Sequence, residues 1–241
     1  MKIDLNCDLG ESAGNDEAIM PYITSANIAC GFHAGDASVM QVTVRLAKQY
    51  GVNIGAHPSW NDRQNFGRLE MNVPAEEVEA IIFQQISALA EIAKVEGVAL
   101  THVKPHGALY NQAATDRGLA DAIARAVKRF SVDLILVGLA GSGLCEAGIE
   151  GGLKVAGEGF PDRAYNPDGT LMSRSKPGAL IEFPEEVANN AVTLIKEGIL
   201  FGEKRMQLDT ICLHGDNKRA AENAILLREV LTKNGIEIMS L

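Results

Sequence analysis

Residues 2–8 read Lys-Ile-Asp-Leu-Asn-Cys-Asp, a stretch in which polar and apolar side chains alternate. This alternation predicts a β-strand, because successive side chains of a strand point to opposite faces. Asp4, Asn6 and Asp8 then share one face of that strand. Burying three polar side chains on one face is costly unless that face lines a polar cavity. The opening strand therefore predicts a sheet that faces a polar cavity.

Strand-like and helix-like segments alternate from this strand to the end of the chain. Such alternation is typical of a parallel sheet with right-handed helical crossovers. Seven strands in 241 residues could close as an incomplete barrel or remain an open sheet, and the periodicity alone does not separate the two. The predicted strands are residues 2–8, 26–32, 52–57, 101–105, 133–139, 154–158 and 210–214. The predicted helices are residues 37–50, 74–95, 115–130, 142–150, 185–197 and 217–234.

The composition bounds the class of protein and its partners. The formal net charge is −9, and Lys and Arg do not cluster, so we expect no nucleic acid and no anionic membrane as partner. No apolar run approaches the ~18 residues of a membrane span, and residues 1–6 do not resemble a signal peptide, which predicts a cytoplasmic protein. Without a linker, a repeat or a low-complexity tract, residues 1–241 are predicted to form one domain. The four cysteines form no C-x-x-C pair and are predicted to be buried thiols.

All five histidines fall where a predicted strand gives way to a loop. They are His33, His57, His102, His106 and His214. In a parallel sheet covered by helices, these strand ends form one face of the domain, where such folds place their chemistry. The histidine positions therefore predict a functional site on that face.

Asp8, His33 and His57 each lie at the end of a different predicted strand. One carboxylate and two imidazoles are a ligand set that suits a divalent transition metal such as Zn or Mn. The same three residues could act as a general base with electrostatic support and no metal. The sequence does not decide between these two interpretations.

The segment His102-Val-Lys-Pro-His106 carries further candidates. His102 and Lys104 share one face of the fourth predicted strand, and Pro105 ends that strand, so His106 lies in the following loop. His102 is either a catalytic group or a core histidine that supports one. Because a buried lysine needs a partner, an acidic residue such as Asp8 or Glu158 should lie beside Lys104.

His214 and Asp216 form a second possible acid–base pair after the last strand. Asp216 is equally suited to cap the last predicted helix. Two loops, residues 58–73 and 160–183, are longer than the connections require, which is typical of binding loops and lids. The chain has no G-x-x-x-x-G-K-[ST] phosphate loop and no G-x-S-x-G nucleophile elbow.

Six segments carry a resemblance to a known family. The chain resembles the LamB/YcsF family, the lactam-utilisation proteins that serve as the A subunit of prokaryotic 5-oxoprolinases. The likeness runs from residue 3 to about residue 235, and its motifs are long and contiguous. They are residues 6–11 (NCDLGE), 25–36 (SANIACGFHAGD), 54–58 (IGAHP), 102–110 (HVKPHGALY), 163–169 (RAYNPDG) and 213–216 (LHGD).

The resemblance implies a distorted, TIM-like (β/α) barrel of seven strands, similar to the glycoside hydrolase/deacetylase superfamily. It also implies a hydrolase that opens 5-oxo-L-proline to L-glutamate while ATP is hydrolysed to ADP and phosphate, in a complex with subunits B and C. The motif positions imply a catalytic set of Asp8, His57, Lys104, His106, Glu158, His214 and Asp216. We expect the substrate to be bound by Asn6, His33, Arg163 and Arg174.

Two other functions remain open at this point. The Asp/His/His set also suits a stand-alone, metal-dependent amidohydrolase or deacetylase that acts on a small amide or N-acyl substrate. A non-catalytic subunit that binds and delivers the substrate is the third hypothesis.

Overall fold

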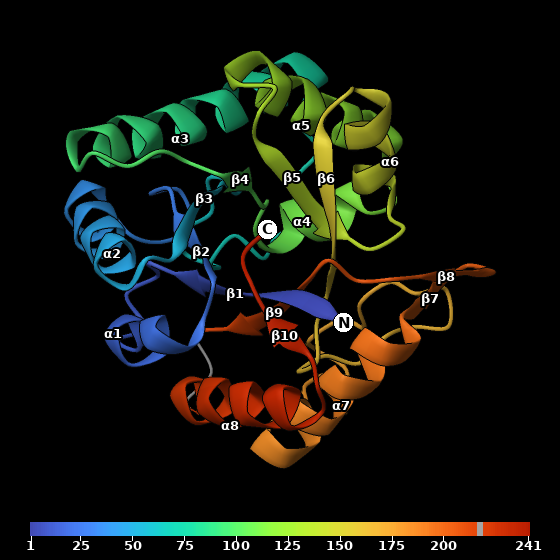
Figure 1. Ribbon diagram of the computed structural model, residues 1–241. Coiled ribbons are helices and arrows are strands. Elements are labelled where there is room, and N and C mark those ends of the chain that lie inside the picture. The colour runs from blue at the N-terminus through green and yellow to red at the C-terminus, as the bar shows by residue number, and fades with distance from the viewer. Residues whose placement is uncertain (216–218) are drawn as a thin grey trace.

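The strands form a closed parallel barrel. A computed structural model describes residues 1–215 and 219–241. Each barrel strand pairs in parallel with the next, and the last pairs back to the first through Asp4 and Thr210 to Asp8 and His214, so the sheet closes (Figure 1). The pairing decides between the two arrangements that the sequence allowed, in favour of the barrel. The barrel strands are β1 (Lys2–Leu9), β2 (Ser25–Ala29), β3 (Asn53–His57), β4 (His102–Val103), β5 (Ile135–Leu139), β6 (Lys154–Gly159) and β9 (Thr210–His214).

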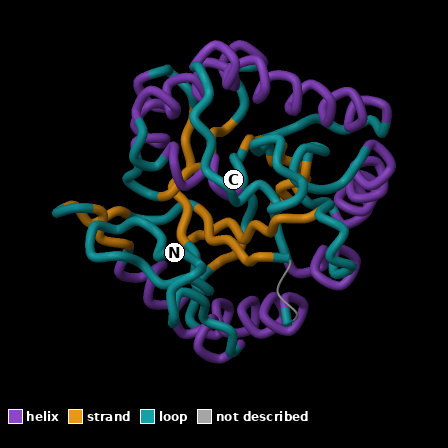
Figure 2. Tube along the Cα trace, turned by 180° about the vertical axis from the view of Figure 1, so that it is seen from behind, coloured by secondary structure: helices purple, strands orange, loops and turns teal. Residues whose placement is uncertain are grey.

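Helices form an outer ring around the strands (Figure 2). Asp36 begins the first long helix by accepting a hydrogen bond from Val39 N, and Gly51 ends it in the left-handed conformation with a φ of 67°. The predicted helix over residues 217–234 begins at Ala220 in the described part of the chain, while residues 217 and 218 lie outside the described residues. The long helices are α2 (Ala37–Tyr50), α3 (Ala75–Val95), α5 (Arg117–Phe130), α6 (Gly143–Glu150), α7 (Pro184–Glu197) and α8 (Ala220–Lys233).

Several short elements were not predicted, because each is too brief to show a hydrophobic period. The antiparallel hairpin of β7 and β8 projects from the body of the molecule beyond α7 (Figure 1). The other short elements lie between the barrel strands or follow the last helix. The short elements are α1 (Asp16–Ile19), η1 (Met20–Tyr22), α4 (Gly107–Ala113), β7 (Ile199–Phe201), β8 (Lys204–Met206) and β10 (Glu237–Ile238).

Two predicted strands end earlier than expected. β2 ends at Ala29 and not at residue 32, because Gly31 adopts a φ of 92°, which turns the chain out of the sheet. β4 contains only His102 and Val103. Pro105 has no backbone N–H with which to continue the strand. His102 therefore opens β4 and does not lie at the strand's end, which corrects the common position assigned to the five histidines.

The interior of the barrel is polar, and the apolar core lies between the strands and the helices. In β1, Asp4, Asn6 and Asp8 are buried on one face, while alternate residues such as Leu5 are fully buried in the apolar core. Hydrogen bonds cross the interior, including Asn6 Nδ2 to Glu158 Oε1 at 2.8 Å between β1 and β6. The polar cavity that the first strand predicts is thus a network of buried, hydrogen-bonded side chains.

His102 is a buried, neutral member of this network. Its Nε2 donates to Asn27 Oδ1 at 2.8 Å, and the Thr101 hydroxyl lies 2.8 Å from its Nδ1. Burial, followed by the positive charge of Lys104, lowers the pKa of His102 to about 3. The imidazole therefore supports the interior network in its neutral form.

The neutral state of His102 predicts a pH dependence of stability. An unfolded histidine gains a proton near pH 6.5, whereas folded His102 gains one only near its pKa of about 3. The stability that the neutral His102 ring contributes is complete above pH 6.5. Below pH 6.5 this contribution falls by about 1.4 kcal/mol for each pH unit. The free energy of unfolding, measured with urea at pH 7, 6 and 5, should decline less with falling pH in His102→Gln than in the native chain. Equal slopes would contradict this prediction.

Gly55 lies where no other side chain fits. A Cβ atom at this position would stand 2.1 Å from Nε2 of His102. Because His102 is held on both sides, Gly55→Ala should lower the free energy of unfolding by about 3 kcal/mol, as overpacked cores do. Urea unfolding measures the loss, and adding His102→Ala in the same chain should recover part of it. An unchanged urea midpoint in Gly55→Ala would contradict this prediction, because it would show that the barrel interior rearranges to accommodate the added methyl group.

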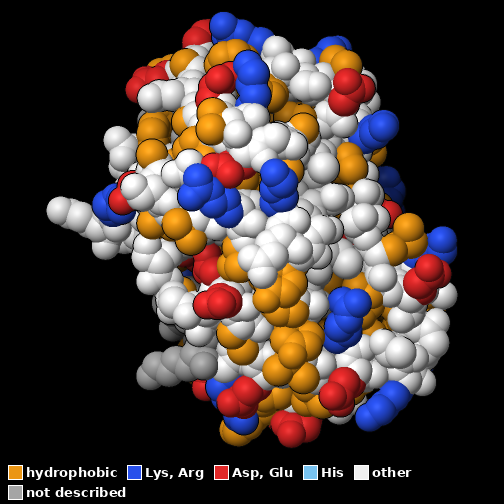
Figure 3. All heavy atoms as spheres, turned by 60° about the vertical axis from the view of Figure 1, so that its left-hand side comes forward, with side chains coloured by type: hydrophobic (Ala, Val, Ile, Leu, Met, Phe, Trp, Pro, Cys, Tyr) orange, Lys and Arg blue, Asp and Glu red, His pale blue; other side chains and the backbone are white. Residues whose placement is uncertain are grey.

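The described cysteines agree with the expectation of buried thiols. Cys7, Cys30, Cys145 and Cys212 are all described, and each is buried with a free thiol. No helix in residues 1–215 and 219–241 has both the length and the apolarity to cross a membrane. Acidic and basic side chains are interspersed over the face seen in Figure 3.

Candidate functional site

A pocket opens at the carboxyl ends of the barrel strands. Its cavity volume is about 480 Å³, and the loop of residues 160–183 forms one of its walls. The structure brings seven of the predicted site residues to this pocket. They are Asp8, His57, Lys104, His106, Arg163, Arg174 and His214.

Lys104 lies at the floor of the pocket between two carboxylates. Its Nζ is 2.9 Å from both Asp8 Oδ1 and Glu158 Oε1, so both acidic partners suggested by the sequence are present. Burial alone would lower the pKa of Lys104, but the negative charge of Asp8, followed by the interaction with Cys212 and the charge of Glu158, raises it well above its usual value. Lys104 is therefore a fixed, buried cation beneath the pocket.

Asp8 is the anion that faces both the lysine and the pocket. Asn27 Nδ2 donates to its Oδ1 at 2.8 Å, and His57 Nε2 lies 3.4 Å from its Oδ2. Burial would raise the pKa of Asp8, but His57 and then Lys104 outweigh it and hold the pKa well below its usual value. Asp8 is therefore ionised, with one oxygen bound by its neighbours and the other directed toward His57.

Glu158 is held from two sides beneath the pocket. The Tyr110 hydroxyl donates to Glu158 Oε2 at 2.8 Å, and Asn6 Nδ2 donates to Oε1. Asn6 thus contacts buried side chains and does not line the pocket. The sequence analysis did not single out Tyr110, although it closes the 102–110 motif. Its pKa is raised well above its usual value by burial and then by the charge of Glu158.

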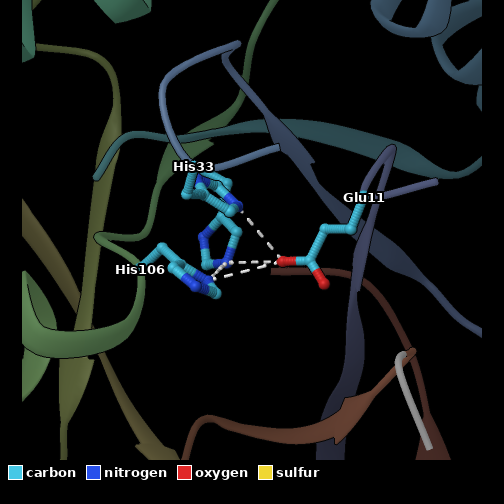
Figure 4. Close-up of side chains that lie close together, drawn as sticks. Glu11, His33 and His106 are labelled. Carbon is cyan, nitrogen blue, oxygen red and sulfur yellow. Dashed lines mark hydrogen bonds and ion pairs between the residues drawn. The ribbon is translucent and has the colours of Figure 1, made fainter. Parts of the chain in front are cut away.

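Three histidines and Glu11 form a compact cluster, in which Glu11, His33 and His106 point toward one another (Figure 4). Each of the four residues brings one ligand atom within 4.8 Å of those of the others, and all four are buried. Glu11 Oε1 lies 3.2 Å from His33 Nε2, 3.4 Å from His106 Nδ1 and 3.8 Å from His57 Nε2. The structure thus groups His33 and His57 with Glu11 and His106, while Asp8 reaches the cluster through His57.

The chemistry of the four donors fits a divalent transition metal. Burial, followed by the neighbouring histidines, lowers the pKa of His33 and His106 well below the usual value, so both rings are neutral. Neutral imidazoles and a carboxylate are the ligands that zinc and similar ions prefer. The sequence analysis overlooked Glu11, although it ends the first motif, because it lies in a loop two residues beyond β1.

His214 forms a second acid–base pair, with Asp162. His214 Nδ1 lies 2.7 Å from Asp162 Oδ2, and its ring stacks on Phe160 with the centroids 5.5 Å apart. Burial would raise the pKa of Asp162, but the charge of His214 outweighs it and lowers the pKa. Asp162 was not predicted as a partner of His214. The predicted partner Asp216 lies outside the described residues, so that pair stays a prediction.

Arg163 organises the loop that walls the pocket. It donates to the carbonyl oxygens of Met172 at 2.6 Å and Ala179 at 3.4 Å. Burial, followed by the like charge of Arg174, lowers its pKa to about 10. Arg174 lies on the pocket lining beside Lys176. The loop therefore brings positive charge to the wall of the pocket.

The closed sheet of parallel strands, with helices outside it and a polar pocket at its strand ends, is a (β/α) barrel. Its fold is similar to the catalytic domain of a peptidoglycan N-acetylglucosamine deacetylase from Eubacterium rectale. The TM-score is 0.54 at 10% identity, over 100% of this chain and 88% of that one.

The chain belongs to the LamB/YcsF family, whose model matches residues 3–241. It is 49% identical over 248 residues to the A subunit of 5-oxoprolinase from Pyrococcus horikoshii, covering 99% of this chain and 97% of the relative. It is also similar to the crystal structure of the lactam utilization protein from Thermus thermophilus. That comparison gives a TM-score of 0.90 and 45% identity over the whole of both chains.

Proposed function

We propose that this chain is a subunit of an ATP-dependent 5-oxoprolinase, in which its pocket opens 5-oxo-L-proline to L-glutamate. The relatives named as the A subunit of 5-oxoprolinase and as a lactam utilization protein support the substrate class. The observation that carries the proposal is the ionised Asp8 beside a buried cation on the pocket floor, at 2.9 Å from Lys104. This pair joins a base with a group that stabilises negative charge.

Each residue of the pocket has a separate role in the proposed amide cleavage. Asp8, with His57 3.4 Å away, orients and deprotonates a water molecule that attacks the lactam carbonyl. Lys104 stabilises the negative charge that develops on the carbonyl oxygen. His214, held by Asp162, gives a proton to the ring nitrogen as the C–N bond breaks. Glu11 and the neighbouring histidines would hold a divalent ion, which would polarise the carbonyl further. Arg174 and Lys176 attract the substrate carboxylate at the pocket wall.

The proposed reaction also requires ATP and the partner subunits B and C. A five-membered lactam is a stable amide, so its opening to the amino acid needs coupling to ATP hydrolysis. Transfer of the terminal phosphoryl group of ATP to the lactam oxygen releases ADP and converts a poor electrophile into a good one. Water then attacks the carbon, the C–N bond breaks, and a second water hydrolyses the resulting acyl phosphate to glutamate and phosphate. The sequence has no phosphate loop, which supports a division of labour in which subunits B and C take part in handling ATP.

Reconstitution tests the proposal directly. The chain is combined with subunits B and C, and glutamate and phosphate release from 5-oxoproline and ATP are measured. Omitting the chain should abolish glutamate formation. Glutamate formation that proceeds equally well without the chain would refute the proposed role. Unchanged turnover after substitution of pocket residues, with substrate still bound, would favour the role of a delivery protein.

A stand-alone metal-dependent amidohydrolase is the second candidate. The cluster of Glu11 and three histidines favours it, since such a metal site works without ATP. The purified chain with Zn²⁺ or Mn²⁺, without ATP or partners, would then cleave a small amide or N-acyl compound. Cleavage under these conditions would replace the 5-oxoprolinase proposal.

A further inference from the structure

We infer that Glu11, His57 and His106 form a divalent metal centre in the wall of the pocket, with His33 holding Glu11 in place. This inference deepens the proposed function, since the centre borders the same pocket. It rests on geometry within the chain, and its test measures metal binding without substrate.

Two imidazole nitrogens, one from His57 and one from His106, face each other beside Glu11. His57 Nδ1 lies 2.7 Å from the carbonyl oxygen of Lys104, and His106 Nε2 lies 2.9 Å from that of Phe66. A carbonyl oxygen only accepts, so both of these ring nitrogens carry the proton. His57 Nε2 and His106 Nδ1 are therefore the ring nitrogens left to bind an ion, and they lie 2.9 Å apart. An ion shared by both nitrogens fits this arrangement.

The carboxylate of Glu11 completes a triangle of metal-binding dimensions. The three ligand atoms are separated by 2.9, 3.4 and 3.8 Å. A circle through three points with these separations has a radius of about 2.0 Å, which matches Zn–N and Zn–O bond lengths. One ion can thus contact all three atoms without rearrangement of the backbone.

His33 supports this triangle and does not join it. Its ring is stacked on that of His106, 3.8 Å apart and 5° from parallel, so the lone pairs of the two rings run side by side and do not converge. Its Nδ1 lies 2.9 Å from Ser59 Oγ, and its Nε2 lies 3.2 Å from Glu11 Oε1. This contact orients the carboxylate, as second partners of metal ligands commonly do.

The backbone is strained at the two places that position this centre. Ser12, with a φ of 62°, and Phe66, with a φ of 58°, are the non-glycine residues with positive φ in the described part of the chain. Ser12 follows Glu11 directly, and the carbonyl of Phe66 fixes the ring of His106. Such strain gathers where function requires a fixed geometry.

The centre is open toward the pocket. His57 and His106 line the cavity, whereas Glu11 and His33 are buried and do not line it. A tetrahedral ion bound by three protein atoms keeps one position for a water molecule or a substrate oxygen. The open side of the triangle therefore faces the cavity.

Titration of the metal-free chain with Zn²⁺ tests the inference. Calorimetry should show one equivalent bound, and Glu11→Gln and His106→Asn should each weaken binding at least about 100-fold. His214→Gln removes another pocket histidine and serves as the matched control, with unchanged binding. Circular dichroism and thermal unfolding of each variant confirm that it is folded.

Co²⁺ in the native chain gives a readout that needs no substitution. Visible absorption should show the bands of a cobalt ion bound by nitrogen and oxygen, without a thiolate-to-cobalt charge-transfer band. Asp8, Cys212 and His214 are also close enough together to hold an ion. A thiolate band, or loss of binding in His214→Gln alone, would place the metal there and overturn the inference. Failure of the native chain to bind Zn²⁺ at micromolar concentration would also overturn it, and a proton would then bridge the two histidines. None of these outcomes depends on whether the chain acts on 5-oxoproline.

Discussion

Replacing Asp8 by Asn should lower the kcat of the reconstituted 5-oxoproline reaction by about 10³-fold or more. Loss of a general base typically costs 10²- to 10⁴-fold, and this substitution keeps the shape of the side chain while removing its charge. Asp8 lies 2.9 Å from Lys104 and 3.4 Å from His57, so its charge also sets the environment of both. Glutamate formation under saturating ATP and 5-oxoproline measures the effect.

The matched control is Asp133→Asn, the same chemical change at an exposed position before β5. Its kcat should equal that of the native chain. The complex must still assemble with Asp8→Asn, which size-exclusion chromatography with subunits B and C shows. An assembled complex of Asp8→Asn that retains full activity would remove Asp8 from the mechanism.

Lys104→Met should cause the largest loss of stability among single substitutions at the site. Lys104 is 2% exposed and lies between two buried carboxylates. Removing one partner of a buried ion pair leaves an uncompensated charge and costs about 3–5 kcal/mol. For a chain of this length, that corresponds to a thermal midpoint lower by roughly 10 °C.

Urea unfolding at neutral pH measures this loss. Lys128→Met, at an exposed position on α5, is the matched control and should unfold like the native chain. Adding Glu158→Gln to Lys104→Met should recover part of the stability, because it removes one of the two unpaired negative charges. If the double variant is less stable than the single one, the ion pair does not account for the loss.

The alternation of polar residues in the first strand was sufficient to predict a polar barrel interior. The same reasoning predicted acidic partners for Lys104, because a buried lysine allows few alternatives. Both inferences depend on the period of one strand, which is a local property of the sequence. Closure of the sheet depends instead on the pairing of β1 with β9, which lie about two hundred residues apart in sequence. Hydrophobic periodicity carries no information on that pairing.

Glu11, Tyr110 and Asp162 were missed for a common reason. Each lies beyond a strand, in a loop or a short helix, where the direction of a side chain depends on the whole chain. Asp162 reaches His214 from another loop at 2.7 Å, although the two residues are far apart in sequence. The pair of His214 with Asp216 stays a prediction, because Asp216 lies outside the described residues. The motifs that resemble the family contain Glu11 and Tyr110, so motif membership was the available signal for these two. Asp162 directly precedes a third motif.

The polar interior also determines how the strands must align. A slip of β1 by one residue would turn Leu5 and Cys7 toward Lys104 and force Asp8 into the apolar layer beneath the helices. Each misaligned barrel would therefore leave several charges without partners, and such forms would be far higher in free energy than the native one. The charged side chains thus determine the register of the strands. They select a single register from the many that apolar packing alone would permit.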